Sequence, residues 1–228
     1  FCLSSRDNHI RSYSMTRIRS DLDFLIQNKI PKVKLVDRTF NYNASRSREI
    51  FQFILEHNQS THFHFEIAAH LLDEPTLQLL ETTPEGTFQF EIGVQSTLKD
   101  TLNAIERKVD LEKLETNVRT LLRDDKIHLH LDLIAGLPGE GFDDCLMSID
   151  RVIRLAPHPL QIEPVKLLPG SPLREQADTM GIRFDPNPPY TILGSQEMSF
   201  EELQKLKEMS RLLDITYNSG NFTTFLTS

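Results

Sequence analysis

The strongest constraint on the fold of this chain is a regular alternation of strand-like and helix-like segments. Five segments have the composition and length of strands, and residues with helical spacing of apolar side chains separate each from the next. The predicted strands cover residues 33–36, 62–69, 88–94, 127–133 and 160–168. The predicted helices cover residues 14–28, 45–57, 71–80, 98–107, 111–124, 143–155 and 199–213. This rhythm indicates repeated βα units and a parallel sheet.

Three of these strands carry polar side chains on one face. The polar positions are His62, His64 and Glu66, then Gln89, Glu91 and Gln95, then His128, His130 and Asp132. Strands that helices cover on both faces have continuous apolar runs instead. A barrel with a polar interior explains the alternation better. We therefore expect an α/β fold, a partial TIM-type (β/α)6 barrel whose first strand precedes Phe1.

Composition narrows the class of partner and the compartment. The chain has 228 residues and a net charge of −8, which disfavours nucleic acid and favours a small molecule or another protein. No apolar run approaches the roughly 18 residues of a membrane span. The two cysteines, Cys2 and Cys145, form no disulfide framework. We expect a cytoplasmic protein.

Proline content suggests where the barrel ends. Residues 184–190 (FDPNPPY) predict a connector in an extended conformation. We therefore expect a barrel over residues 1–183, a connector over 184–198 and the truncated start of a helical region over 199–228.

Polar or turn residues stand where each predicted strand stops. They are Asp37, Glu66, Gln95, Asp132 with Gly136, and the turn at residues 167–170. In βα barrels the chemistry takes place at the carboxyl ends of the strands. We therefore expect these residues to converge on one site.

Two His-x-His pairs allow a different interpretation. His62 with His64 and His128 with His130 could bind a divalent metal, as in barrel hydrolases. Both pairs precede the acidic residue of their strand, toward the less reactive end of the barrel. This position favours a lining role, and a metal-dependent hydrolase remains an alternative.

Several motifs together resemble the core of the radical S-adenosylmethionine (SAM) enzymes. They are VDRTF at 36–40, FEIAAHLL at 65–72, EIGVQS at 91–96 and DLIAGLPGE at 132–140, and Phe1-Cys2 resembles the end of the family's CxxxCxxC motif. VDRTFN at 36–41 resembles the cobalamin-binding subgroup that includes the anaerobic magnesium-protoporphyrin IX monomethyl ester oxidative cyclases.

The resemblance assigns roles near the start of the chain. Cys2 would ligate the iron of a 4Fe-4S cluster, and Phe1 would pack near the adenine of SAM. The turn after Asp37 would stand where the family's glycine-rich loop meets the SAM amino group. The other two cluster cysteines would lie upstream of Phe1, so we expect the chain as given to be inactive alone.

The resemblance also implies how SAM would be held. Glu66 would pair with an arginine, and Arg107 matches that arginine and would bind the SAM carboxylate. The side chains of Gln95 and Asp132 would hydrogen-bond the ribose. The adenine would lie between the backbone from Ile134 to Gly136 and the edge at Leu168.

The resemblance therefore implies a radical SAM enzyme. It would bind a 4Fe-4S cluster and SAM, cleave SAM reductively to a 5′-deoxyadenosyl radical, and act on a small-molecule substrate. An electron donor such as flavodoxin or ferredoxin and an N-terminal cobalamin domain in the same chain would be its partners. A barrel that keeps SAM-site residues without catalysis is a further alternative.

Overall fold

The computed structural model describes residues 10–221, and its centre is a five-stranded parallel sheet. The strands pair in chain order and are β1 (Lys32–Leu35), β2 (His62–Glu66), β3 (Phe88–Gln95), β4 (His128–Ala135) and β5 (Leu160–Pro164). The structure thus confirms the five predicted strands and their parallel arrangement.

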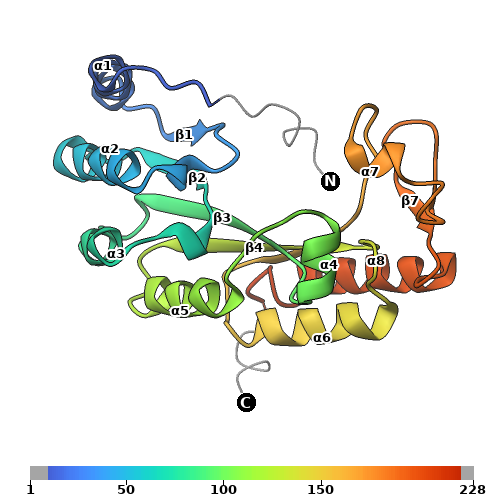
Figure 1. The fold of residues 1–228 in the computed structure, drawn as a ribbon. Helices are drawn as coiled ribbons and strands as arrows, with labels where there is room; N and C mark the ends of the chain where they lie inside the picture. The colour runs from blue at the N-terminus through green and yellow to red at the C-terminus, as the bar shows by residue number, and fades with distance from the viewer. Residues whose placement is uncertain (1–9, 222–228) are drawn as a thin grey trace.

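Helices connect the strands and cover one face of the sheet. They are α1 (Met15–Gln27), α2 (Ala44–His57), α3 (Glu74–Glu81), α4 (Lys99–Ala104), α5 (Leu111–Leu122), α6 (Phe142–Ile153), α7 (Pro172–Glu175) and α8 (Phe200–Ile215), with short 3-10 turns η2 (Phe40–Tyr42) and η3 (Ala69–Leu71). Figure 1 shows α2, α3, α5 and α6 along one side of the sheet, with α1 and α7 toward its two edges. None of the described helices is long and apolar enough to cross a membrane.

The core lies between the sheet and these helices. Phe51 of α2 packs against Phe65 and Phe88, with ring centroids 5.1 and 5.4 Å apart, and all three rings are fully buried. Each buried phenylalanine contributes about 2 kcal/mol by leaving water. The alternation of these strands therefore turns their apolar face toward the helices and their polar face inward.

The C-terminal part differs from the extended connector that the prolines predicted. Residues 183–194 form a small antiparallel hairpin of β6 (Arg183–Phe184) and β7 (Ile192–Gly194). The backbone N–H of Leu167 donates to the carbonyl of Tyr190 at 2.8 Å, and the guanidinium of Arg174 lies over the Tyr190 ring. These contacts fold the proline segment back along the chain that follows β5.

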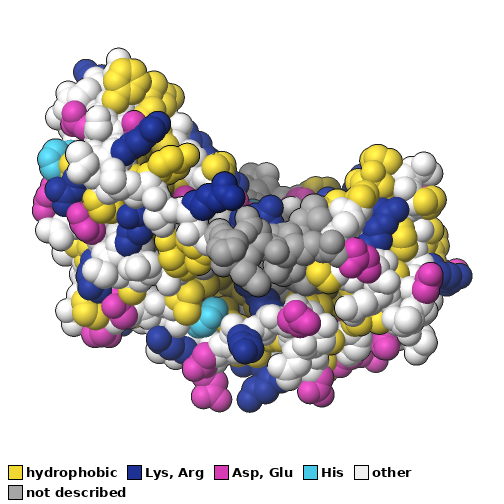
Figure 2. All heavy atoms as spheres, turned by 45° about the horizontal axis from the view of Figure 1, so that its top comes forward, with side chains coloured by type: hydrophobic (Ala, Val, Ile, Leu, Met, Phe, Trp, Pro, Cys, Tyr) yellow, Lys and Arg dark blue, Asp and Glu magenta, His cyan; other side chains and the backbone are white. Residues whose placement is uncertain are grey.

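Helix α8 lies beside the barrel, against β5 and β7. Its N-terminus has a capping box, in which Ser199 and Glu202 each bond the backbone of the other. The division into a barrel, a connector and a C-terminal helical region remains a prediction. Figure 2 shows that the α1 end and the hairpin end of the molecule rise on either side of its middle.

Candidate functional site

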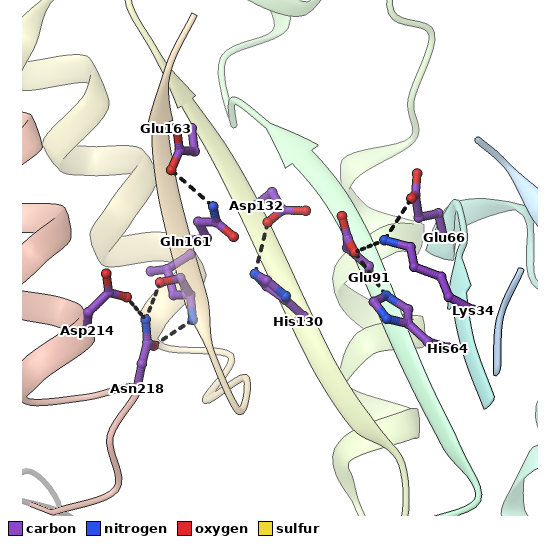
Figure 3. Close-up of polar contacts among 11 residues, drawn as sticks. Lys34, His64, Glu66, Glu91, His130, Asp132, Gln161, Glu163, Asp214 and Asn218 are labelled. Carbon is purple, nitrogen blue, oxygen red and sulfur yellow. Dashed lines mark hydrogen bonds and ion pairs between the residues drawn. The ribbon is translucent and has the colours of Figure 1, made fainter. Parts of the chain in front are cut away.

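Polar side chains form a row across the inner face of the sheet. The parallel register sets Glu66 beside Glu91, Gly93 beside Asp132, and Asp132 beside Gln161. Figure 3 shows Glu66 and Glu91 close to Lys34, and Asp132 between Glu91 and Gln161 on the next strand. Of the predicted strand-end residues, Glu66 and Asp132 therefore lie on the same face of the sheet, together with Glu91 and Gln161.

A charged cluster occupies the β1 side of this row. The Lys34 Nζ lies 3.2 Å from Glu66 Oε1 and 3.3 Å from Glu91 Oε2, and His64 Nε2 lies 2.9 Å from Glu91 Oε2 (Figure 3). Burial and the Lys34 charge lower the pKa of His64. Burial opposes the charge on Lys34, but the two carboxylates together raise its pKa. At neutral pH, His64 is therefore neutral and Lys34 carries the positive charge of the cluster.

His130 and Asp132 form a second pair, on β4. The His130 Nε2 lies 3.1 Å from Asp132 Oδ1, and both side chains are about four-fifths buried. The hydrogen-bonding influence of Asp132 outweighs burial and raises the pKa of His130. Asp132 therefore lies partly buried beside His130, level with Gly93 in the sheet.

Gly93 is the point on which three predicted site residues converge. A Cβ atom built at Gly93 would lie 2.1 Å from Gln95 Nε2 and 3.6 Å from Arg107 Nη2. The Arg107 Nη2 also donates to the Gly93 carbonyl, and Asp132 is the register partner of Gly93. The missing side chain thus makes room for an amide and a guanidinium next to a carboxylate.

The backbone of Gln95 supports this arrangement. Its φ is +72°, a left-handed conformation that is uncommon outside glycine, and the β3–β4 register shifts between Gly93 and Gln95. This bulge turns the Gln95 side chain back across Gly93 on the inner face. In a regular strand, the side chains of residues 93 and 95 would point in the same direction from the sheet, about two residues apart, and would not overlap.

The histidine pairs have other partners than a metal. His62 Nδ1 lies 2.8 Å from the Gly86 carbonyl, and the His128 ring lies 4.6 Å from the ring of His158. Burial and then the charge of His158 lower the pKa of His128 to about 4. Within residues 10–221 no three His, Cys, Asp or Glu side chains are grouped so as to hold a metal ion. The structure of this part therefore gives the hydrolase alternative no metal site.

Comparison with solved structures identifies this architecture. The radical SAM methyltransferase TsrM from Kitasatospora setae superposes with a TM-score of 0.66 at 16% identity, covering 78% of this chain and 37% of TsrM. The radical SAM enzyme coproporphyrinogen III oxidase (HemN) from Escherichia coli has a TM-score of 0.53 at 18% identity, covering 75% of this chain and 48% of HemN. The fold is the radical SAM partial barrel.

Sequence comparisons match shorter parts of this radical SAM barrel. Anaerobic coproporphyrinogen III oxidase 1 of Cereibacter sphaeroides is 34% identical over 95 residues, which are 42% of this chain and 21% of that protein. Protein YhcC of Escherichia coli is 31% identical over 81 residues, or 36% of this chain and 26% of YhcC. These matches span about a fifth to a quarter of each relative. A family model described as a protein of unknown function (DUF4080) matches residues 178–228.

The other predicted site residues lie at three further positions in the fold. Asp37 is exposed just after β1 and lines a cavity of about 300 Å³. Ile134 is half-buried and level with Glu163 in the sheet, and Leu168 is half-buried in the turn after β5. Phe1 and Cys2 lie outside the described residues.

Two of the expected contacts take a different form in this barrel. Glu66 forms an ion pair with Lys34, whereas its predicted partner Arg107 donates to the backbone of Gly93. Gly136 has φ +82°, and a Cβ there would lie 3.0 Å from Ile192 of the hairpin. Gly136 is therefore needed for a left-handed turn that β7 covers closely.

Three residues that shape this part of the barrel were not predicted from the sequence. Gly93 stands within EIGVQS at an inward strand position. A glycine at such a position indicates that another group approaches the backbone closely. Ser96 is the last residue of EIGVQS and Glu140 is the last residue of DLIAGLPGE, and both side chains are almost fully buried. The Ser96 hydroxyl donates to Glu140 Oε1 at 2.6 Å, so the two motifs meet through their last residues.

Proposed function

We propose that this chain is the catalytic barrel of a radical SAM enzyme. Its activity would be reductive cleavage of SAM to a 5′-deoxyadenosyl radical that acts on a small-molecule substrate. The names of the similar proteins support this reaction class, since they include radical SAM enzymes in the same fold.

The observation that carries the proposal is the convergence on Gly93. The Gln95 amide and the Arg107 guanidinium lie next to Gly93, and Asp132 is the register partner of Gly93 on the neighbouring strand β4. SAM has a carboxylate and two ribose hydroxyls, and these three side chains complement those groups. A glycine at the centre lets a ligand or side chain approach the backbone closely.

Each residue then has a task in holding the ligand. Arg107 binds the carboxylate of SAM, and Gln95 and Asp132 bind its ribose hydroxyls. The backbone from Ile134 to Gly136 and the edge at Leu168 flank the adenine. When bound, a 4Fe-4S cluster and SAM supply the electron transfer and the radical chemistry. We assign one iron ligand to Cys2 and the other two to cysteines upstream of Phe1.

The likeness to TsrM supports a more specific proposal. TsrM has been solved with cobalamin and a [4Fe-4S] cluster bound, and VDRTFN at 36–41 resembles cobalamin-type radical SAM proteins. We therefore assign a cobalamin domain to the N-terminal side of the full-length protein, in the subgroup of the anaerobic cyclases. A flavodoxin or ferredoxin would be its electron donor, and the cytoplasm its compartment.

The test uses the full-length protein, reconstituted without oxygen with iron and sulfide. We expect cluster absorbance, calorimetric SAM binding and release of 5′-deoxyadenosine on reduction. Cys2→Ala should abolish the cluster. Asp132→Ala should weaken SAM binding about 10-fold to 100-fold, because a hydrogen bond to a charged group is worth about 1.5–3 kcal/mol.

Asp150→Ala is the matched control, since Asp150 forms an exposed ion pair with Arg154 on α6. This variant should bind SAM like the wild type. A full-length protein that holds no cluster would refute the proposal. SAM binding without any cleavage would favour a non-catalytic scaffold, and zinc lost on His62→Ala would favour the hydrolase.

A further inference from the structure

A buried carboxylate lies between the two loops that carry predicted SAM-binding residues. Glu140 is 1% exposed, although no described cation is paired with it. It follows the turn at Gly136 and begins the loop that leads into α6. Burying a carboxylate without a cation costs free energy, so the hydrogen bonds that Glu140 accepts must stabilise it. These bonds indicate its role.

The first of these bonds reaches the loop after β3. Ser96 Oγ donates to Glu140 Oε1 at 2.6 Å and accepts from the backbone N–H of Leu98 at 3.1 Å. Ser96 is 0% exposed and directly follows Gln95, the residue with φ +72°. The carboxylate thus fixes the residue next to the strained one.

A second set of bonds ties the same loop to α6. Ser148 Oγ lies 3.5 Å from Glu140 Oε1 and 2.9 Å from Thr97 Oγ1, and it accepts from the Thr97 backbone N–H at 3.3 Å. The backbone N–H of Glu140 donates to the carbonyl of Leu137, next to Gly136, at 3.3 Å. The buried thiol of Cys145 lines the same small cavity as Glu140 and Ser148. Glu140 is therefore connected to both predicted SAM-binding loops, at Gln95 and at Gly136.

We propose that Glu140 is a positioning residue that locks the left-handed backbone of Gln95 and so holds the Gln95 amide over Gly93. It does not touch SAM itself. This inference rests on the proposed function, because it assigns Gln95 to the ribose of SAM. The lock consists of Glu140 and Ser96, and Ser148 supports it through its bonds to Glu140 and Thr97.

The geometry explains why this residue must be an acceptor. A left-handed backbone at a residue other than glycine persists only when its surroundings hold it. Ser96 can serve both Leu98 and Glu140 only if the group at position 140 accepts its hydroxyl proton. A glutamine retains an acceptor oxygen of the same shape, whereas an alanine removes it.

The test measures ligand affinity in the reconstituted full-length protein by calorimetry. Glu140→Ala and Ser96→Ala should each weaken SAM binding about 10-fold, and Glu140→Gln should restore it to within about 2-fold of the wild type. Binding of L-methionine, which has no ribose, should be unchanged in all three variants. The double variant Glu140→Ala/Ser96→Ala should bind SAM no more weakly than either single variant.

Asn117→Ala provides a control for lost stability. Asn117 is also buried, and it hydrogen-bonds the carbonyls of Ala69 and Leu72 away from this lock. This variant should unfold at a lower temperature but keep the SAM affinity of the wild type.

The outcomes separate this inference from the proposed function. A wild type that binds no SAM refutes the proposed function. A wild type that binds SAM, with Ser96→Ala binding equally well, refutes the lock alone, and so does an equal loss of SAM and methionine affinity. Ser96→Ala decides the matter if Glu140→Ala does not fold, because it removes only one hydroxyl.

Discussion

At the residue scale, this barrel depends on a side chain that is absent. Gly93 occupies an inward position of β3, and the other inward positions of this strand carry the polar side chains of Gln89, Glu91 and Gln95. Its missing Cβ gives space to the amide of Gln95, which the bulge directs back over the strand. The chemistry proposed for Gln95, Arg107 and Asp132 therefore rests on a residue without chemistry of its own.

Gly93→Ala tests this dependence directly. The added methyl would lie 2.1 Å from Gln95 Nε2, so the amide must move, and we expect SAM affinity in the full-length protein to fall at least 10-fold. Calorimetric titration with SAM measures this. Gly141→Ala is the control, because a Cβ there meets its neighbours at an ordinary 3.5 Å. Equal affinities in the two variants would contradict the assigned position of Gln95.

Glu140 also predicts a pH dependence of stability. Burial, only partly offset by Ser96, raises its pKa from 4.5 to about 6. Between these values the folded state binds more protons than the unfolded state, so the free energy of unfolding falls as the pH rises. The loss from this group is about 2 kcal/mol and is complete above pH 6.

Urea unfolding of the wild type and Glu140→Gln measures this effect. The difference in unfolding free energy between the two proteins should change by about 2 kcal/mol between pH 4.5 and 7, in favour of the variant at the higher pH. The charges of all other groups cancel in this difference. A constant difference across the range would mean that Glu140 has an ordinary pKa.

At the scale of elements, the edge of β5 is closed by a side chain. The Leu160 backbone donates to Asn218 Oδ1 and accepts from Asn218 Nδ2, both at 2.9 Å. Figure 3 shows Asn218 between β5 and Asp214 of α8. The amide therefore replaces a neighbouring strand at this point, which protects an edge and ties α8 to the sheet.

Asn218→Ala should loosen this connection. We expect the Leu160 amide hydrogen to exchange faster and the free energy of unfolding to fall by about 1–3 kcal/mol, because two backbone groups lose their partner. Hydrogen exchange and urea unfolding provide the two measurements. Ser219→Ala, which removes an exposed hydroxyl bonded to the Ile215 carbonyl, should have little effect on either. Unchanged protection at Leu160 would show that the edge is closed by other means.

At the scale of the whole molecule, the two ends of the barrel have different roles. Gln95 ends β3, and Arg107 and Asp132 lie beside Gly93 of the same strand. His62 and His128 are the first residues of β2 and β4 and contact Gly86 and His158. Such a division between a reactive and a structural end is the rule in βα barrels. The iron content of the reconstituted protein should therefore not depend on His62 or His128.

The variant His62→Ala/His128→Ala checks this division. In the reconstituted full-length protein, we expect its iron and sulfide content to equal that of the wild type, since His62 Nδ1 lies 2.8 Å from the Gly86 carbonyl and the His128 ring lies 4.6 Å from the His158 ring. Elemental analysis measures the content, and Cys2→Ala is the control that should lose it. Iron lost from the histidine variant would return the His-x-His pairs to the set of metal ligands.

The sequence by itself determined the five parallel strands, most helices and the polar inner face, because strand and helix periodicities are local properties of the chain. It also predicted Gln95 at a strand end correctly, whereas Asp132 lies within β4, which continues to Ala135. Only the tertiary structure decided that Glu66 pairs with Lys34, that Arg107 reaches Gly93, and that the proline segment is a hairpin. These depend on which strands become neighbours, on a register shift and on long-range packing, and no local pattern encodes them. The same reason hid the bond between Ser96 and Glu140, two residues that close separate motifs and meet only in the folded barrel.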